Sequence, residues 1–119
     1  MSSMTCASVT INNMKTFETV EPGKLYTVYN SESAWQKVLA KDCAMNDGYH
    51  NNWYPGEDAV LTSYKMFMVI RKDKPCEGAK NHTGSNMIGR LYIILAESGR
   101  VGYIHVYPQD FFEEHPCDV

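Results

Sequence analysis

The sequence predicts a mainly β protein with one α-helix, built as a small barrel or a strongly bent antiparallel sheet. Three observations carry this prediction. Two segments, 64–71 and 90–96, are apolar on both faces of a strand and rich in residues that favour strands. A tight turn over 97–100 leads from the second segment into another strand, 101–106. One further segment instead spaces its apolar residues with the period of a helix.

The chain begins with thirteen residues that are mostly small or polar, which we expect to form a flexible extension to a single domain spanning 14–119. Glu21-Pro22-Gly23 predicts a type II turn, because proline favours its second position and glycine its third. The leucine, valine and tyrosine residues of 24–29 predict the strand that follows the turn.

The segment 33–42 predicts the helix, inserted after this first main strand. Trp35, Val38 and Leu39 fall at positions i, i+3 and i+4, so their side chains would share one face.

The strands 64–71 and 90–96 need cover on both faces. In the first of them, alternation places three residues on one face and two on the other: Met66, Met68 and Ile70 against Phe67 and Val69. A barrel interior would cover one face, and the helix or a partner the other. This pattern therefore also predicts self-association. Within 101–106, Gly102 indicates a bulge, a bend or the close approach of another backbone.

The loop 46–58 carries Tyr49, Trp53 and Tyr54, which are unusual in a plain solvated linker. These rings either dock on the fold and hold the loop in place, or present an adhesive surface. We favour docking and keep both interpretations open.

The stretch RLYIILAESGRVGYIHVYPQDFFEE, residues 90–114, resembles the C-terminal half of SH3-type barrels. Gly102-Tyr103-Ile104 falls on the G-Y-I of that family, and 108–112 falls where the family has a one-turn 3₁₀ segment before its last strand. The resemblance implies a small β-barrel used as a noncatalytic recognition platform. The tryptophan pair of the family is replaced by Leu91-Tyr92, so binding of proline-rich peptides does not follow.

Charge and cysteine usage indicate which partners and which cellular compartment to expect. The net charge of −3 disfavours broad polyanion binding, since nucleic-acid binders usually carry a basic excess. No run approaches the roughly 18 apolar residues that span a bilayer, and no secretory signal opens the chain. Four dispersed cysteines are predicted to be free thiols in a reducing compartment: Cys6, Cys43, Cys76 and Cys117. We therefore expect a cytoplasmic protein, in the host cell if it is viral.

The sequence predicts neither a catalytic site nor a metal or cofactor site. His115 and Cys117 are the one close histidine–cysteine pair, without the second pair that a structural zinc site requires. Alternation places His105 on the face of Tyr103, which favours a packed strand histidine with its hydrogen bonds satisfied over a general base. Adjacent Glu113 and Glu114 would point to opposite faces of a strand.

The predicted function is therefore protein binding without catalysis. The style of the sequence resembles small phage accessory proteins that inhibit or modulate a host protein. The expected surface is aromatic and acidic: Tyr49, Trp53, Tyr54, Tyr103, Tyr107, Asp110, Glu113 and Glu114. The alternative is a homo-oligomeric binder of nucleotides or other small ligands, which would combine aromatic stacking with basic loop residues: Arg71, Lys72, Lys74 and Arg90.

Overall fold

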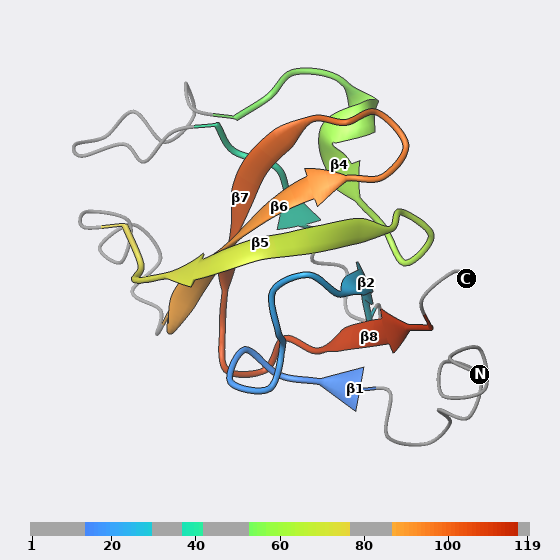
Figure 1. Ribbon diagram of the computed structural model, residues 1–119. Coiled ribbons are helices and arrows are strands. Elements are labelled where there is room, and N and C mark those ends of the chain that lie inside the picture. Colours follow the sequence, from blue (N-terminus) through green and yellow to red (C-terminus); the bar gives the residue numbers. More distant parts are fainter. Residues whose placement is uncertain (1–13, 30–36, 42–52, 77–86, 117–119) are drawn as a thin grey trace.

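The computed structural model describes residues 14–29, 37–41, 53–76 and 87–116 (Figure 1). These ranges form short strands and one 3₁₀ turn: β1 (Met14–Lys15), β2 (Leu25–Val28), β3 (Lys37–Val38), η2 (Glu57–Ala59), β4 (Val60–Leu61), β5 (Phe67–Asp73), β6 (Gly89–Leu95), β7 (Val101–Val106) and β8 (Phe112–His115). No helix among these residues has the length and hydropathy that crossing a bilayer would require.

The strands form a six-stranded antiparallel sheet in the order β1-β8-β2-β5-β6-β7 and a smaller pair, β3-β4. In Figure 1 the β5-β6-β7 part lies above the β1-β8-β2 part, and buried side chains of both parts meet in one cluster, so the large sheet is bent. Its described edges, β1 and β7, do not pair with each other. The prediction of a mainly β protein is confirmed. The sheets are not closed into a barrel, and the resemblance to SH3-type barrels stays a prediction.

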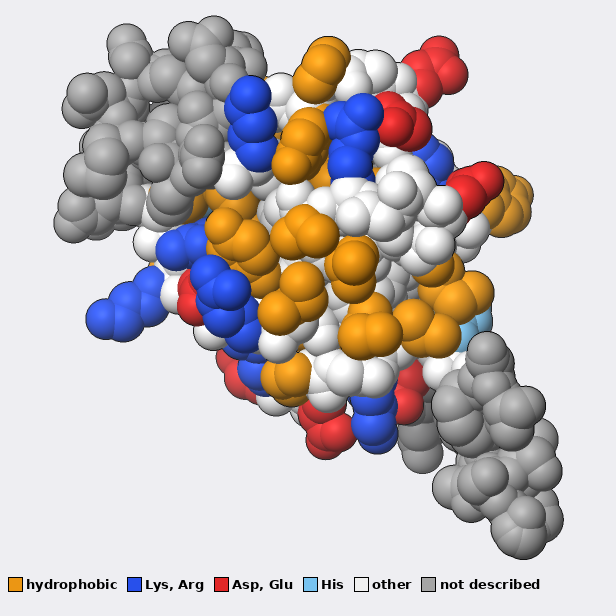
Figure 2. All heavy atoms as spheres, turned by 45° about the horizontal axis from the view of Figure 1, so that its top comes forward, with side chains coloured by type: hydrophobic (Ala, Val, Ile, Leu, Met, Phe, Trp, Pro, Cys, Tyr) orange, Lys and Arg blue, Asp and Glu red, His pale blue; other side chains and the backbone are white. Residues whose placement is uncertain are grey.

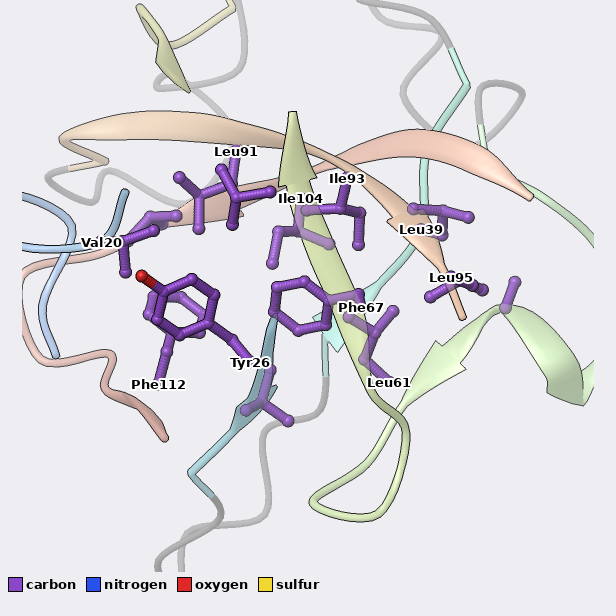
Figure 3. Close-up of a cluster of buried hydrophobic side chains, with 14 residues drawn as sticks. Val20, Tyr26, Leu39, Leu61, Phe67, Leu91, Ile93, Leu95, Ile104 and Phe112 are labelled. Carbon is purple, nitrogen blue, oxygen red and sulfur yellow. The ribbon is translucent and has the colours of Figure 1, made fainter. Parts of the chain in front are cut away.

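The core lies inside the bend of the sheet (Figure 3). Three aromatic rings occupy its centre: Tyr26 and Phe67 lie 6.4 Å apart between centroids, and Phe67 meets Phe112 edge to face at 6.3 Å. Such edge-to-face contacts add to the free energy gained from burial. Aliphatic residues from the strands and from the segments beside them fill the space around the rings: Val20, Leu39, Leu61, Val69, Leu91, Ile93, Leu95, Ile104 and Val106.

The predicted faces of the two apolar strands are confirmed. In β5, Phe67 and Val69 point into the core, whereas Met68 and Ile70 point outward. In β6 the buried and half-buried residues alternate along the whole strand. The register of β5 shifts between Val69 and Arg71, which makes Ile70 the extra residue of a β-bulge opposite β6.

The predicted helix over 33–42 is wrong for the part of it that the structure describes. Lys37–Val38 form β3, and Ala40 bridges both Trp53 and Tyr103. The Leu39 amide donates a hydrogen bond to the distant Ala59 carbonyl at 2.8 Å and not to a carbonyl four positions earlier, as in an α-helix. Tertiary sheet pairing has overridden the local helical period. Residues 33–36 and 42 lie outside the described ranges.

Gly102 is explained by the close approach of another backbone. Tyr103 and Ala40 exchange two hydrogen bonds, at 2.8 and 2.9 Å, which bring the 37–41 segment alongside β7. A Cβ atom at Gly102 would therefore lie 2.4 Å from the Ala40 carbonyl oxygen. The sequence left open a bulge, a bend or a close backbone approach at this glycine, and the structure shows the close approach.

The turns follow their sequence signals, with one correction. Gly23, after Pro22, has a φ of 88°, and Gly99 in the predicted β6–β7 hairpin has a φ of 76°. The chain after β7 makes a turn at 108–109 before β8, where the SH3 resemblance implied a 3₁₀ segment over 108–112.

The expectation of free thiols is wrong at Cys76, which is buried and disulfide-bonded. Cys76 follows β5 and lies against the outer face of β7, where its sulfur is 3.3 Å from the Tyr103 hydroxyl oxygen. Cys76 belongs to a small second cluster of buried residues on that face. The other three cysteines lie outside the described residues.

Candidate binding surfaces

Two of the predicted loop aromatics dock on the fold. Trp53 packs half-buried against the cluster of Ala40 and Tyr103. Tyr54 packs against the main core, and its hydroxyl donates a hydrogen bond to the Val101 carbonyl at 2.8 Å. The docking interpretation is therefore confirmed for these two rings. Tyr49 lies outside the described residues.

Tyr103 belongs to the interior, although the sequence placed it on the binding surface. Only 2% of the residue is exposed, because Ala40, Cys76, Trp53 and Tyr92 pack around it. Its ring packs beside that of Tyr92, with centroids 5.8 Å apart.

Tyr107 and Asp110 surround a largely buried lysine, Lys37. Asp110 forms an ion pair with Lys37 and also accepts a hydrogen bond from the Tyr107 amide at 2.8 Å. The ammonium lies 4.7 Å from the centre of the Tyr107 ring and donates to the His105 carbonyl at 2.7 Å. Burial lowers the pKa of Lys37, and the charge of Asp110 opposes that shift. Both predicted residues thus stabilise a lysine inside this chain.

His105 packs beside Tyr103 on the outer face of β7, with ring centroids 5.2 Å apart, as the alternation predicted. Burial, together with the charges of Lys37 and Arg90, lowers the pKa of His105 to about 4. Its Nε2 atom is buried and has no hydrogen-bond partner among the described residues, so the expectation of a satisfied histidine is wrong at this atom. The charges that shift its pKa are both positive.

The two adjacent glutamates of β8 point to opposite faces, as predicted. Glu114 forms ion pairs with Lys15 and Lys24, at 3.7 and 3.6 Å. Glu113 lies on the outer face, in register with Met14 of β1 and Thr27 of β2. Of the predicted acidic residues that the structure describes, Glu113 is the one that no described cation pairs with.

Next to Glu113 the structure exposes large apolar side chains that the predicted site omitted. The Tyr29 amide donates to the Phe111 carbonyl at 2.9 Å, which places the two residues side by side at the ends of β2 and β8. Tyr29 is 48% and Phe111 42% exposed. Met14, also exposed, lies beside Glu113 on β1. We name Met14, Tyr29, Phe111 and Glu113 the aromatic–acidic patch. Strand alternation from the buried Phe112 was the signal that could have identified Phe111.

The basic residues of the alternative ligand site do not point together towards a shared ligand position. The Arg71 guanidinium stacks on the Tyr92 ring at 3.9 Å, and both Arg71 and Arg90 pair with Asp73, at 3.0 and 3.3 Å. Lys72 points away from them and donates to the Phe17 carbonyl at 2.9 Å. Lys74 is exposed just after β5.

A second exposed apolar surface covers the outer face of the sheet. Its side chains come from four adjacent strands, and we name them the sheet-face patch: Leu25, Met68, Ile70, Ile94 and Val101. Figure 2 shows hydrophobic side chains gathered across the middle of one face of the molecule, with Lys and Arg side chains along one side.

The described residues contain no group of three or more side chains able to hold a metal ion. Comparison with known proteins found no matching family model, no matching curated protein and no matching solved structure.

Proposed function

We propose that this protein is a noncatalytic protein-binding module whose contact surface is the aromatic–acidic patch. The observation that carries the proposal is the pair of exposed rings, Tyr29 and Phe111, side by side at the ends of β2 and β8. Large aromatic side chains that gather on a surface are typical of protein interfaces, where they bury much area and lose little conformational entropy.

The chemistry of the patch indicates the partner. Tyr29, Phe111 and Met14 would enter an apolar depression, and Glu113 would meet a lysine or arginine at its rim. An inhibitor or modulator of a host protein, encoded by a phage, would be one protein of this kind. That origin stays a prediction from the sequence.

The test is quantitative affinity capture with the full chain and its Phe111→Ser variant. Truncating a central interface aromatic costs about 2 kcal/mol or more, so we expect at least a tenfold loss of a captured partner. Glu113→Lys should also weaken capture, because it would place a cation against the expected cation of the partner. The matched control is Tyr64→Ser, which removes an exposed ring from the turn before β5.

Thermal unfolding of each variant shows whether the fold is retained. Equal capture by wild type and Phe111→Ser, with both folded, would overturn the aromatic–acidic patch as the contact surface. The alternative, a nucleotide binder, predicts instead that a nucleotide raises the unfolding temperature of the wild type. Three of its four basic residues, Arg71, Lys72 and Arg90, are engaged with Asp73, Tyr92 and backbone carbonyls, so we favour protein binding.

A further inference from the structure

We infer that two copies of this chain associate face to face through the sheet-face patch, related by a two-fold axis that lies in the plane between the two faces and runs across the strands. This inference concerns a different surface from the proposed function and does not rest on it.

The sheet-face patch is continuous because its residues are cross-strand neighbours. Leu25 of β2 lies opposite Met68 of β5, Met68 opposite Ile94 of β6, and Ile94 opposite Val101 of β7. An apolar row thus crosses four strands. Cross-strand neighbours lie about 5 Å apart, so no polar side chain of these strands interrupts the row.

The β-bulge widens the row. Because Ile70 is the extra residue between Val69 and Arg71, both Ile70 and Arg71 face outward. Ile70 is 40% exposed and Val101 at the far strand is 44% exposed. These side chains are held on strands rather than on loops, so they present a preformed apolar surface.

The two ends of this face carry opposite charge. At the end where Asp73 of β5 pairs with Arg90 of β6, the described residues place three cations against one carboxylate: Arg71, Lys74 and Arg90 against Asp73. At the end of the β6–β7 hairpin, the part of the chain that the structure describes places three carboxylates against two cations: Glu57, Asp58 and Glu97 against Lys65 and Arg100. The apolar row lies between these ends.

A second copy fits this distribution. A two-fold axis that runs along the row, in the plane between the two faces, turns the second copy over and end for end, so the basic end of each chain lies over the acidic end of the other. Face-to-face sheets pack in this manner, with interdigitating apolar side chains at their centre. One self-complementary surface therefore provides both the apolar and the charged contacts.

The test is sedimentation velocity of the full chain at micromolar concentration. We expect the wild type to sediment as a dimer and Ile70→Glu as a monomer, because the substitution would bury two carboxylates at the centre of the interface. Phe111→Ser, in the aromatic–acidic patch, is the matched control and should remain dimeric. A non-reducing gel shows whether any dimer is disulfide-linked.

A second variant tests the orientation and does not depend on the apolar centre. Arg71→Glu should weaken the dimer several-fold at low salt and have a smaller effect at high salt, because salt screens the contact between the two ends. A wild type that sediments as a monomer throughout would overturn the inference. A dimer that persists in a folded Ile70→Glu variant, or one that is disulfide-linked, would also overturn it. These outcomes leave the capture experiment with Phe111→Ser unaffected.

Discussion

Gly102 marks the place where the chain tolerates no side chain. Its neighbour there is the backbone oxygen of Ala40, which cannot move aside as the end of a flexible side chain could. The requirement is steric and comes from the approach of a segment more than sixty positions earlier in the chain.

We therefore expect Gly102→Ala to lower the free energy of unfolding by about 3 kcal/mol, because the Cβ atom would force Ala40 away from β7. Chemical denaturation measures this difference. Gly99→Ala is the matched control. Gly99 has open space around it but a φ of 76°, so we expect a loss of only about 1 kcal/mol. Equal losses at the two positions would contradict the steric explanation.

His105 gives the stability of the fold a defined dependence on pH. Its pKa in the folded chain is about 4, below the ordinary value of 6.5, because burial, Lys37 and Arg90 oppose its protonation. Between these two values the unfolded chain binds a proton that the folded chain does not. The free energy of unfolding should therefore be intact above pH 6.5 and fall as the pH drops towards 4.

We expect this contribution to be about 2 kcal/mol over that window, after allowing for partial exposure of the ring. The measurement is urea denaturation of the wild type and His105→Gln at pH 7 and at pH 4.5. Glutamine does not titrate, so the variant should lose less stability than the wild type on acidification. A variant with the same loss as the wild type would show that His105 is not the group responsible.

At the scale of elements, the 37–41 segment shows where sequence reasoning failed. The spacing of Trp35, Val38 and Leu39 satisfies a helix, yet Leu39 enters the core from an extended chain. Leu39 and Ala40 form backbone hydrogen bonds with Ala59 and Tyr103, which are distant in sequence. The spacing of apolar residues within one segment contains no information about hydrogen-bond partners elsewhere in the chain. The pairing of 37–41 with β7 could therefore not be predicted from that spacing.

Ala40→Pro tests whether this segment is an integral part of the sheet. Proline removes the amide that donates to the Tyr103 carbonyl and leaves that carbonyl without its partner. We expect the free energy of unfolding to fall by about 2 kcal/mol or more in chemical denaturation. Lys41→Pro is the matched control, because Lys41 is exposed and proline favours an extended residue before it. A similar small loss in both variants would show that the bridge contributes little.

The elements that were predicted correctly share a local cause. The faces of β5 and the hairpin at Gly99 follow from alternation and from turn residues within a few positions. The bulge at Ile70 gave no local signal, because it depends on the register of β6 against β5. That bulge decides which residues of β5 reach the outer surface.

At the scale of the whole molecule, the predicted site changed more than the predicted fold. Tyr103 and Trp53 lie in or against the second cluster, and Asp110 is committed to Lys37. Glu113 remains on an outer face and is joined there by Phe111. Residue type and alternation identified side chains suited to an interface, but burial depends on which distant segment covers each strand.

A mainly β chain with two strands that are apolar on both faces follows from local sequence, because strand period and turn chemistry act over a few residues. Three features come from tertiary contacts instead: the open sheet, its extension by 37–41, and the choice of apolar side chains that remain exposed. These features depend on hydrogen bonds and contacts between segments far apart in the chain. The sheet-face patch includes outward-facing apolar side chains of the two strands that are apolar on both faces. Some of these side chains, such as Met68 and Ile70, stay exposed to solvent in the single chain.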